Sequence, residues 1–458
     1  MVEHACCIVL AAGDGKRMKS QYPKVMCKIL DKPMILWVTE SVYSAGISAC
    51  CVVVGSGAEL ISAVLPPHCE TTLQAERLGT GHAASMAVPF LQKTGAKDVC
   101  VLFGDSPLLS PQELSTSLAQ HRAQKNHVTL LTARLADPTG YGRILRDGEQ
   151  VAAIVEQADA TPAQLEISEI NSGACWFDAA FLQVFFQNMT AANKQGEYYL
   201  TESVAYARKN GYRTGAYTAG ADAVLGANDR AALAKLNQIV RERILEKHRR
   251  NGVDIPLDDG VLIGPDVTIG QDTTILPGSV ILGSSHIGTD CEIGPNSYLT
   301  GATIGNHCLV RSSYIDRSTL EDRVRVGPMS NLRPGTTLRT GVKIGDFVEV
   351  KNSDIGRGTA ISHLTYVGDS DVGSECNLGC GVVTVNYDGS QKHRTTIGNH
   401  VFVGCNCNLI APVTLGDNVY AAAGTTITEN VPNDALVIGR SRQTVKPEWT
   451  KKKRLFGK

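Results

Sequence analysis

The sequence predicts a chain of two parts, a doubly wound α/β domain followed by a parallel β-helix. In the first half, short aliphatic runs alternate with helix-like segments, the pattern of strands and crossover helices around a mostly parallel sheet. In the second half, Ile or Leu recurs at every sixth residue from Ile263 to Leu299. A six-residue period fits neither a helix nor a simple strand, and it is typical of a β-helix whose stacked coils point aliphatic side chains inward.

Length, composition and charge agree with a folded chain of at least two domains. Of the 458 residues, 43% are hydrophobic and 19% charged, which is enough for a buried core. The 44 Lys and Arg nearly balance the 45 Asp and Glu, so charge gives no case for nucleic acid or an anionic membrane as partner.

Compartment is indicated by the N-terminus and the cysteines. No apolar run approaches the roughly 20 residues of a membrane span, and Glu3 and His4 stand where a signal peptide would carry basic residues. The 14 cysteines include no C-x-x-C pair, and several lie in strand-like runs. This pattern favours reduced core thiols and a cytoplasmic protein.

The first 227 residues are expected to form the α/β domain. Residues 6–10, 50–54 and 99–103 read as strands and residues 33–45 as a helix. Residues 228–252 then carry aliphatic side chains at helical spacing, with Asn228 as a candidate N-cap and Gly252 as the stop. We expect them to form a connecting helical arm.

Residues 253–458 are expected to form the β-helix and a basic tail. Three six-residue repeats make one triangular coil, so residues 253–437 predict about ten coils. The period slips near Ile304, Ile355 and Val372 and is lost over residues 385–396. We interpret all four irregularities as insertions, which in solenoids often form binding loops. The basic tail beyond Val437 reads mostly as a solvated end.

A glycine-rich loop at residues 10–18 follows the first strand, and its small residues expose backbone N–H groups to an anion. Lys16 and Arg17 add positive charge, which favours phosphate binding; an ordinary glycine turn is the alternative. The loop is not a dinucleotide fingerprint, because Met18 replaces the third glycine, and it lacks the spacing of a P-loop.

Two further residues sharpen the phosphate hypothesis. Lys24 follows Pro23, which holds the chain extended and aims a cation near the same site, although by itself it reads as a surface lysine. Asp105 comes shortly after the strand at 99–103, at the sheet edge where open α/β folds bind ligands. A carboxylate beside phosphates is a usual Mg²⁺ ligand; capping the turn that follows is an equal alternative.

The β-helix also carries polar residues that a scaffold does not need, several of them at its irregular coils. His363 comes two places after the inward-facing Ile361, so its simplest interpretation is a surface histidine. The polar group comprises Arg333, Lys351, His363, Tyr366, Asn377, Asn386, Tyr387 and Lys392.

The motifs taken together resemble sugar-nucleotide pyrophosphorylases. With the repeats that follow, they resemble one family of bifunctional bacterial enzymes, which join N-acetylglucosamine-1-phosphate uridyltransferase to glucosamine-1-phosphate N-acetyltransferase on a left-handed β-helix of hexapeptide repeats. Such enzymes make precursors of peptidoglycan and lipopolysaccharide. The resemblance spans essentially the whole chain and is carried by residues 10–18, 23–24, 74–76, 78–83, 103–105, 140–144, 156, 169–171, 197–201 and 228–229.

For the first half, the resemblance implies uridyl transfer from UTP to N-acetylglucosamine 1-phosphate, with release of pyrophosphate and no protein nucleophile. Mg²⁺, Arg17 and Lys24 would neutralise phosphoryl charge. Asp105 and Asn228 would bind Mg²⁺, a role that for Asn228 competes with capping the helix. The residues implied to bind UDP-N-acetylglucosamine are Leu10, Ala11, Ala12, Gly13, Lys24, Gln74, Gly79, Thr80, Gly142, Glu156, Asn171 and Asn228.

For the β-helix, the resemblance implies acetyl transfer from acetyl-CoA to glucosamine 1-phosphate, with His363 as the general base for the amine. The residues implied to bind the sugar phosphate are Arg333, Lys351, Tyr366 and Asn377. Those implied to bind acetyl-CoA are Cys380, Asn386, Tyr387, Cys405, Ala423 and Arg440. Members of the family are homotrimers with active sites between prisms, so partner chains would complete each site.

Departures from the family and rival functions qualify this assignment. Lys16 stands where the family usually has Thr and is given no role, and Cys380 and Cys405 replace smaller or hydroxyl side chains. A monofunctional sugar-nucleotide pyrophosphorylase with a regulatory β-helix is the nearer rival, disfavoured by His363 and Lys351. A sensing or regulatory subunit that has lost its chemistry is disfavoured by the retained Lys24.

Overall fold

The computed structural model describes residues 4–13, 15–191 and 196–455. Glu3, Asp14 and Lys458, which belong to the N-terminus, the glycine-rich loop and the basic tail, lie outside the described residues. The chain divides into two compact units, Met1–Glu242 and Arg243–Lys458. This division falls inside helix α9 (Arg230–Arg250), within the stretch expected to form the arm.

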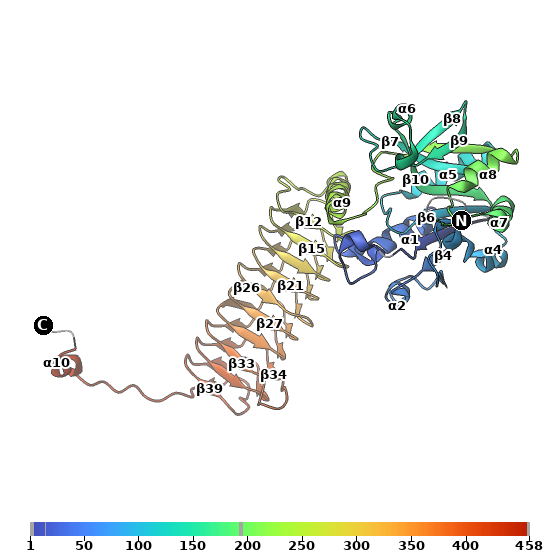
Figure 1. The fold of residues 1–458 in the computed structure, drawn as a ribbon. Helices are drawn as coiled ribbons and strands as arrows, with labels where there is room; N and C mark the ends of the chain where they lie inside the picture. The colour runs from blue at the N-terminus through green and yellow to red at the C-terminus, as the bar shows by residue number, and fades with distance from the viewer. Residues whose placement is uncertain (1–3, 14, 192–195, 456–458) are drawn as a thin grey trace. The chain divides into compact units, whose positions relative to one another are not determined.

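A mixed β-sheet forms the centre of the first unit (Figure 1). In sheet order its strands are β11 (Thr214–Thr218), β7 (Val128–Arg134), β10 (Glu169–Asp178), β6 (Asp98–Phe103), β1 (Ala5–Ala11), β4 (Ala49–Val54) and β5 (Cys69–Leu73). In addition, β8 (Arg143–Asp147) pairs with β10, and β9 (Gln150–Val155) pairs with β8. Strands β6, β1, β4 and β5 are parallel neighbours, and β11 pairs parallel with β7. Strand β10 runs antiparallel between β6 and β7, so the sheet is mostly parallel, as predicted.

Both faces of this sheet are covered, which explains why its inner strands are continuous aliphatic runs. Every residue of β1 is buried. Cys7 and Val9 enter the core on one face and Cys6 and Ile8 the core on the other, because successive strand residues point to opposite faces. The helices of this unit are α1 (Met34–Ser44), α2 (Ala58–Ser62), α3 (Thr80–Ser85), α4 (Val88–Thr94), α5 (Pro111–Ala123), α6 (Pro162–Leu165), α7 (Ala179–Asn188) and α8 (Glu202–Lys209).

Helix α9 is capped by Asp229 rather than by the predicted Asn228. The Asp229 carboxylate accepts a hydrogen bond from the Ala232 N–H at 2.8 Å, the usual bond of an N-cap side chain. The Asn228 side chain accepts a hydrogen bond from Lys24 instead. The predicted cap was wrong by one residue, because adjacent Asn and Asp are equally good caps. Gly252 follows the helix end as expected, with a φ of 87° that favours glycine.

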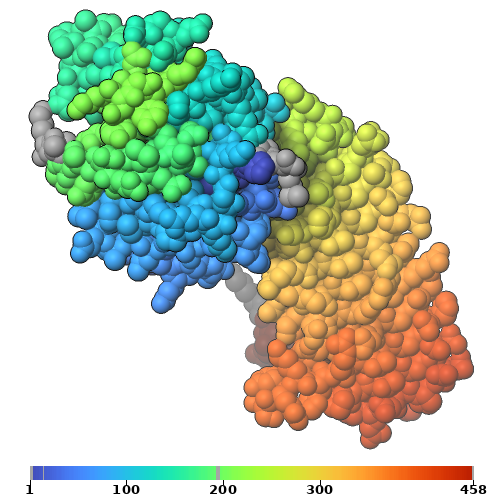
Figure 2. Space-filling model, turned by 90° about the vertical axis from the view of Figure 1, so that its right-hand side faces the viewer, coloured from blue at the N-terminus to red at the C-terminus, as the bar shows by residue number. Residues whose placement is uncertain are grey.

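Three parallel sheets form the second unit and enclose a triangular prism (Figure 1). They contain ten, nine and ten strands and run from β12 (Leu262–Ile263), β13 (Thr268–Ile269) and β14 (Thr274–Ile275) to β39 (Thr426–Ile427), β37 (Val413–Leu415) and β40 (Leu436–Val437). Successive coils pair in register, as Ile263 does with Ile281. The inward aliphatic side chains therefore form columns in one core, and the coils stack without gaps in the space-filling view (Figure 2). The predicted β-helix and its coil number are confirmed.

Glycine follows many of the inward residues because the neighbouring coil leaves no room for a side chain. A Cβ atom added to Gly288 would lie 2.6 Å from the Gly305 carbonyl oxygen. The tight stacking of the coils thus depends on these glycines.

Three of the four predicted insertions are wrong. Ile304 follows the previous inward residue, Leu299, by five residues instead of six, and the same shortening precedes Ile315, Leu320, Ile355 and Val372. A turn with one residue fewer shifts the period just as an insertion does. The one true insertion among the four lies within residues 385–396: residues 386–394 form a loop between β33 (Val383–Val385) and β34 (Thr395–Ile397).

All 14 cysteines are free, and most are buried as expected of reduced core thiols. Cys69 and Cys380 are partly exposed, and Cys405 is exposed. Across residues 4–455, apart from the undescribed positions, no helix is long and apolar enough to cross a membrane. Residues 438–455 of the tail are exposed and include a short helix, α10 (Trp449–Lys453).

Replacing Ile315 by Ala should destabilise the β-helix by about 2–5 kcal/mol, because this buried side chain is stacked between Leu299 and Leu332. Its loss leaves a cavity that the coils on either side cannot close. Urea unfolding followed by circular dichroism measures the change. The matched control is Thr319→Ala, an exposed residue of the next strand, which should cost less than about 0.5 kcal/mol. Equal stability of the two variants would contradict a core made of these columns.

Candidate active sites

The first candidate site lies at the carboxyl ends of β1 and β6, where a cavity of about 480 Å³ opens. Gly15 allows the loop after β1 to approach Lys24: its φ is 59°, and a Cβ there would lie 2.5 Å from the Lys24 Cβ. Arg17 reaches the cavity from the short 3₁₀ helix η1 (Lys16–Met18). The predicted residues that line the cavity are Leu10, Ala11, Ala12, Gly13, Arg17, Lys24, Gln74, Gly79, Thr80, Asp105 and Asn228.

Lys24 joins two residues from distant parts of the sequence. Its ammonium forms an ion pair with Asp105, which follows β6, and donates to the Asn228 Oδ1 at 2.9 Å, just before α9. The Lys24 and Asp105 side chains are only 13% and 23% exposed, so water screens this pair less than a surface pair. The structure therefore brings all three predicted residues together.

One wall of the cavity is held by main-chain contacts. The buried Gln74 side chain donates through Nε2 to the Gly79 carbonyl at 3.2 Å. The Thr80 hydroxyl accepts a hydrogen bond from the Leu200 N–H at 3.0 Å. Gly79 has a φ of 110°, and a Cβ there would lie 2.5 Å from the Tyr198 carbonyl oxygen. Gly79 and Thr80 are therefore fixed against the segment that contains Tyr198 and Leu200.

A second cavity of about 700 Å³ adjoins the first and contains the predicted sugar-binding residues Gly142, Glu156 and Asn171. The Asn171 N–H donates to the Gly142 carbonyl at 2.9 Å, which ties two of them together. Asp105 and Asn228 line both cavities. The Lys24 cluster thus lies where a nucleotide in one cavity and a sugar phosphate in the other would meet.

The residues around Lys24 fit a divalent cation. The Asp105 and Asn228 side-chain oxygens converge on one positive group, the Lys24 ammonium. Within the described part of the chain, no group of three His, Cys, Asp or Glu side chains could hold a metal. Mg²⁺ does not need such a group, because it commonly takes one or two protein oxygens and completes its shell with phosphates and water.

Several cavity residues were given no role by the sequence analysis. Arg77 and Glu197 line the first cavity, and Tyr141 and Tyr199 the second. Burial raises the pKa of Tyr141, and the charge of Asp105 adds to the shift. Arg77 lies between residues 74–76 and 78–83, two segments on which the resemblance rests, so its charge beside them was the signal that could have found it.

In the β-helix, four predicted residues gather on one sheet, which contains β24 (Asn331–Leu332), β27 (Glu349–Lys351), β30 (Tyr366–Gly368) and β33 as neighbours. Arg333 follows the first of these strands, Lys351 ends the second, Tyr366 begins the third and Asn386 follows the fourth. Arg333 pairs with Glu349 at 2.9 Å, and the Asn386 amide donates to the Tyr366 hydroxyl at 3.4 Å.

Positive charge is concentrated in this group. Lys392, from the inserted loop, contacts Lys351 and is the main reason that the pKa of Lys351 is lowered; burial lowers it further, and Asp369 opposes the shift. Two adjacent ammonium groups are a suitable counter-charge for a phosphate dianion. Lys392 received no individual role from sequence.

His363 ends β29 (Ala360–His363) and stacks on Asp346 of β26 (Lys343–Asp346). The His363 Nδ1 lies 3.1 Å from the Asp346 carboxylate. An ionised carboxylate only accepts hydrogen bonds, so Nδ1 carries the proton and Nε2 is left as the acceptor. The imidazole is 58% exposed and can be reached by a ligand.

The strand register continues from His363 to three residues implied to bind acetyl-CoA. Strand β29 pairs with β32 (Asn377–Leu378), β32 with β35 (Phe402–Val403) and β35 with β38 (Tyr420–Ala421). His363, Cys380, Cys405 and Ala423 therefore occupy equivalent positions on four successive coils, which we call the corner column. Arg440 donates to the Ala423 carbonyl at 2.8 Å and extends this column.

Asn377 and Tyr387 do not join Lys351 and Tyr366 within one chain. Asn377 is exposed on β32, in a different sheet from Lys351 and Tyr366. Tyr387 is exposed in the inserted loop, where its hydroxyl donates to the Gly389 carbonyl at 2.7 Å. The predicted acetyl-transfer residues thus lie on two sides of the prism.

Comparison with known proteins gives matches over both units. A MobA-like NTP transferase domain model matches residues 7–163, and models of the bacterial transferase hexapeptide and of the hexapeptide repeat of succinyl-transferase match residues 266–301 and 394–429. Two curated relatives called bifunctional protein GlmU, from Caldanaerobacter subterraneus subsp. tengcongensis and Clostridium beijerinckii, are 47% and 44% identical, with 99% of this chain and 99% of each relative covered. A solved structure of a putative glucose-1-phosphate thymidylyltransferase from Bacillus anthracis is 17% identical, with a TM-score of 0.44, and covers 52% of this chain and 96% of that one.

Proposed function

The chain belongs to the family of bifunctional GlmU proteins, and we propose how its residues carry out the family's two reactions. It is a glucosamine-1-phosphate N-acetyltransferase and a UDP-N-acetylglucosamine diphosphorylase. We assign uridyl transfer to residues 1–227, the connecting helix to 228–252 and acetyl transfer to 253–458. The observation that carries the assignment is the pair of separate constellations, Lys24 with Asp105 and Asn228 between two cavities, and His363 on the corner column.

In uridyl transfer, a phosphate oxygen of N-acetylglucosamine 1-phosphate attacks the α-phosphorus of UTP, and pyrophosphate leaves. The chain supplies alignment and charge instead of a nucleophile. Gln74, whose Nε2 is engaged by Gly79, keeps its amide oxygen available for a pyrimidine N–H. Arg17 and Lys24 stabilise negative charge on the phosphoryl oxygens, and Glu156 and Asn171 orient the sugar.

Mg²⁺ would be held by Asp105 and Asn228, and when bound it would neutralise phosphate charge. Asp105 also pairs with Lys24, so the same carboxylate orients the lysine that faces the phosphates.

In acetyl transfer, the amine of glucosamine 1-phosphate attacks the thioester carbonyl of acetyl-CoA; a C–N bond forms, the C–S bond breaks and coenzyme A leaves as the thiol. His363 Nε2 takes the proton that the amine loses, a contribution of about 10²- to 10⁴-fold in rate. Asp346, bonded to Nδ1, orients the ring and stabilises the imidazolium. Arg333 and Lys351 bind the sugar phosphate, and Tyr366 and Asn377 the sugar.

Coenzyme binding is assigned to the corner column and to the inserted loop. Cys380, Cys405 and Ala423 follow His363 coil by coil, so an extended acyl carrier along them would bring its thioester toward the base. Arg440 suits a coenzyme phosphate. Asn386 and Tyr387 contribute from the loop.

We further propose a homotrimer located in the cytoplasm. The trimer is supported by the position of Asn377 on a different sheet from Lys351, because a neighbouring prism could complete a site that one chain leaves divided. The cytoplasm is supported by the 14 free thiols, which persist in a reducing compartment.

The two reactions should be separable by single substitutions. With glucosamine 1-phosphate, acetyl-CoA, UTP and Mg²⁺, Asp105→Ala should abolish pyrophosphate release and leave thiol release unchanged, since Asp105 belongs to the first unit and lines the two cavities assigned to uridyl transfer. His363→Ala should lower thiol release by about 10²- to 10⁴-fold and, with N-acetylglucosamine 1-phosphate supplied, leave pyrophosphate release unchanged. If either substitution silences both reactions in folded protein, the two-site assignment fails.

Light scattering on the full chain should give a mass about three times that of the 48.9 kDa chain, because the acetyl site is expected to need a neighbouring prism. A monomer that transfers acetyl groups at full rate would refute the shared site.

A maleimide should inhibit acetyl transfer before uridyl transfer, because Cys380 and Cys405 are accessible members of the corner column and accessible thiolates are the reactive form. Acetyl-CoA should protect the enzyme, and the double variant Cys380→Ala, Cys405→Ser should be resistant. Cys69→Ser, which removes the other partly exposed thiol, is the control and should stay sensitive. Unchanged sensitivity of the double variant would assign the effect to another cysteine.

A further inference from the structure

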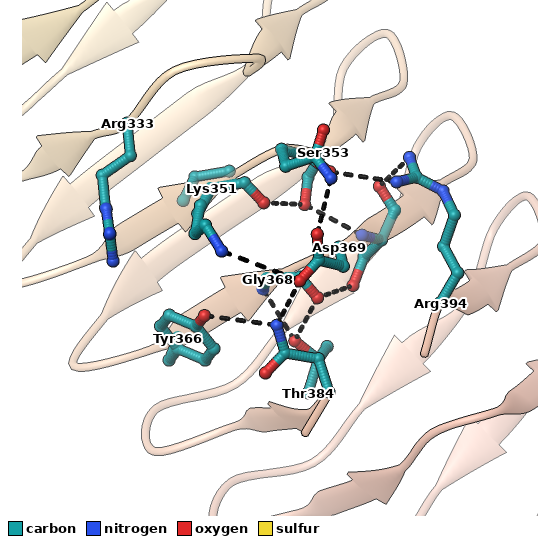
Figure 3. Close-up of polar contacts among 12 residues, drawn as sticks. Arg333, Lys351, Ser353, Tyr366, Gly368, Asp369, Thr384 and Arg394 are labelled. Carbon is teal, nitrogen blue, oxygen red and sulfur yellow. Dashed lines mark hydrogen bonds and ion pairs between the residues drawn. The ribbon is translucent and has the colours of Figure 1, made fainter. Parts of the chain in front are cut away.

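Asp369 lies at the centre of the polar cluster beside Lys351 (Figure 3). Its side chain is buried, with the residue only 6% exposed. Oδ1 accepts a hydrogen bond from the Asn352 amide at 2.5 Å, and Oδ2 accepts one from the Asn386 amide. Because Asn352 and Asn386 belong to the coils on either side, one carboxylate links three successive coils.

The backbone of Asp369 makes the same connection. Its N–H donates to the Lys351 carbonyl at 2.9 Å, and its carbonyl accepts from the Thr395 N–H at 3.1 Å. Thr395 lies at the end of the inserted loop and Asn386 near its start, so Asp369 holds both ends of the segment that carries Lys392. Arg394 of the loop makes a separate contact with the prism, because its Nε donates a hydrogen bond to Asp371 Oδ2 at 2.7 Å.

The charges that face Asp369 are mostly positive. Lys351, from β27, places its Nζ 4.0 Å from Oδ2, and Lys392 of the loop contacts Lys351. Four more charged residues lie around Asp369 and Lys351. They form two ion pairs, Glu349 with Arg333 and Asp371 with Arg394.

Asp369 is ionised despite its burial. Burial alone would raise its pKa, but the hydrogen bonds from Asn352 and Asn386 and the charges of Lys351 and Lys392 hold the pKa below its usual range. It is therefore a carboxylate at every pH at which the lysines bind phosphate.

We propose that Asp369 is a positioning residue for acetyl transfer, which holds Lys351, Lys392 and Asn386 together as a preformed site for the phosphate of glucosamine 1-phosphate. This inference rests on the acetyl transfer proposed above. Two adjacent ammonium groups repel each other, and the charge of Lys392 favours loss of the Lys351 proton. The buried Asp369 carboxylate opposes this effect, so Lys351 keeps its charge before the phosphate arrives. Asp369 acts through its neighbours and needs no contact with substrate.

The test is Asp369→Asn, which removes the charge with little change in size. The KM for glucosamine 1-phosphate should rise about 10- to 100-fold, with kcat within about threefold, because the lost interaction serves binding. Without the carboxylate, the pKa of Lys351 falls further. The alkaline limb of the kcat/KM profile should therefore move to lower pH by roughly one unit, while uridyl transfer in the same sample is unchanged.

Three further variants make the test specific. Asp290→Asn is the control, with the same chemical change at an exposed aspartate that pairs with His307 on a distant coil, and should keep KM within about twofold and the alkaline limb in place. Asp369→Glu keeps the negative charge, so its alkaline limb should stay at the pH found for the unaltered protein. Lys392→Gln removes the repelling charge and should move the limb to higher pH, which keeps the proposal testable if Asp369→Asn does not fold.

The outcomes separate this proposal from the function on which it rests. A lower kcat in Asp369→Asn with an unmoved alkaline limb, or an unchanged KM, would overturn the proposal and leave Asp369 a residue of the fold alone. An unmoved limb in Lys392→Gln would overturn it as well. If the unaltered protein released no thiol from acetyl-CoA, the proposed acetyl transfer itself would fail.

Discussion

The parallel register of the strands is the constraint on which both candidate sites depend. In the first unit it brings the carboxyl ends of β1 and β6 to one edge of the sheet, where the glycine-rich loop, Lys24 and Asp105 meet. In the β-helix it stacks equivalent positions of successive coils, so His363 on one coil is followed by Cys380, Cys405 and Ala423 on the next three. In both units, backbone hydrogen bonds between strands bring together side chains that are far apart in sequence.

Each site also contains a lysine held by a largely buried carboxylate. The two carboxylates differ in whether they are free to change partners. A lysine alone is a flexible, strongly hydrated charge, and a fixed partner reduces the ordering needed when a phosphate binds. Asp105 pairs with Lys24 and is also expected to bind a metal, so its partners must change as substrates arrive. Asp369 has each oxygen bonded to an asparagine amide and can keep its place throughout the reaction.

Periodic features of the fold could be predicted from sequence, because burial repeats along each strand or coil. The six-residue period indicated the β-helix and the alternation of runs indicated the sheet. The shortened turns before Ile315 and Ile355 were misread, since a period that slips looks the same after a deletion as after an insertion. Most site residues came from the family resemblance. Asp346 and Asp369 did not, because which coil position stacks on which depends on every shortened turn between them.

The corner column gives a physical reason why a β-helix suits a long acyl carrier. Neighbouring strands are about 4.8 Å apart, so the three steps from Ala423 to His363 span about 14 Å. A ligand extended along this corner would meet groups whose positions are set by the core columns, and the protein would lose little conformational freedom on binding it. The distance between Arg440, bonded to Ala423, and the base is then fixed by the number of coils. A regular coil cannot reach across its neighbours, so the proposed phosphate site requires the inserted loop, which Asp369 and Arg394 connect back to the prism.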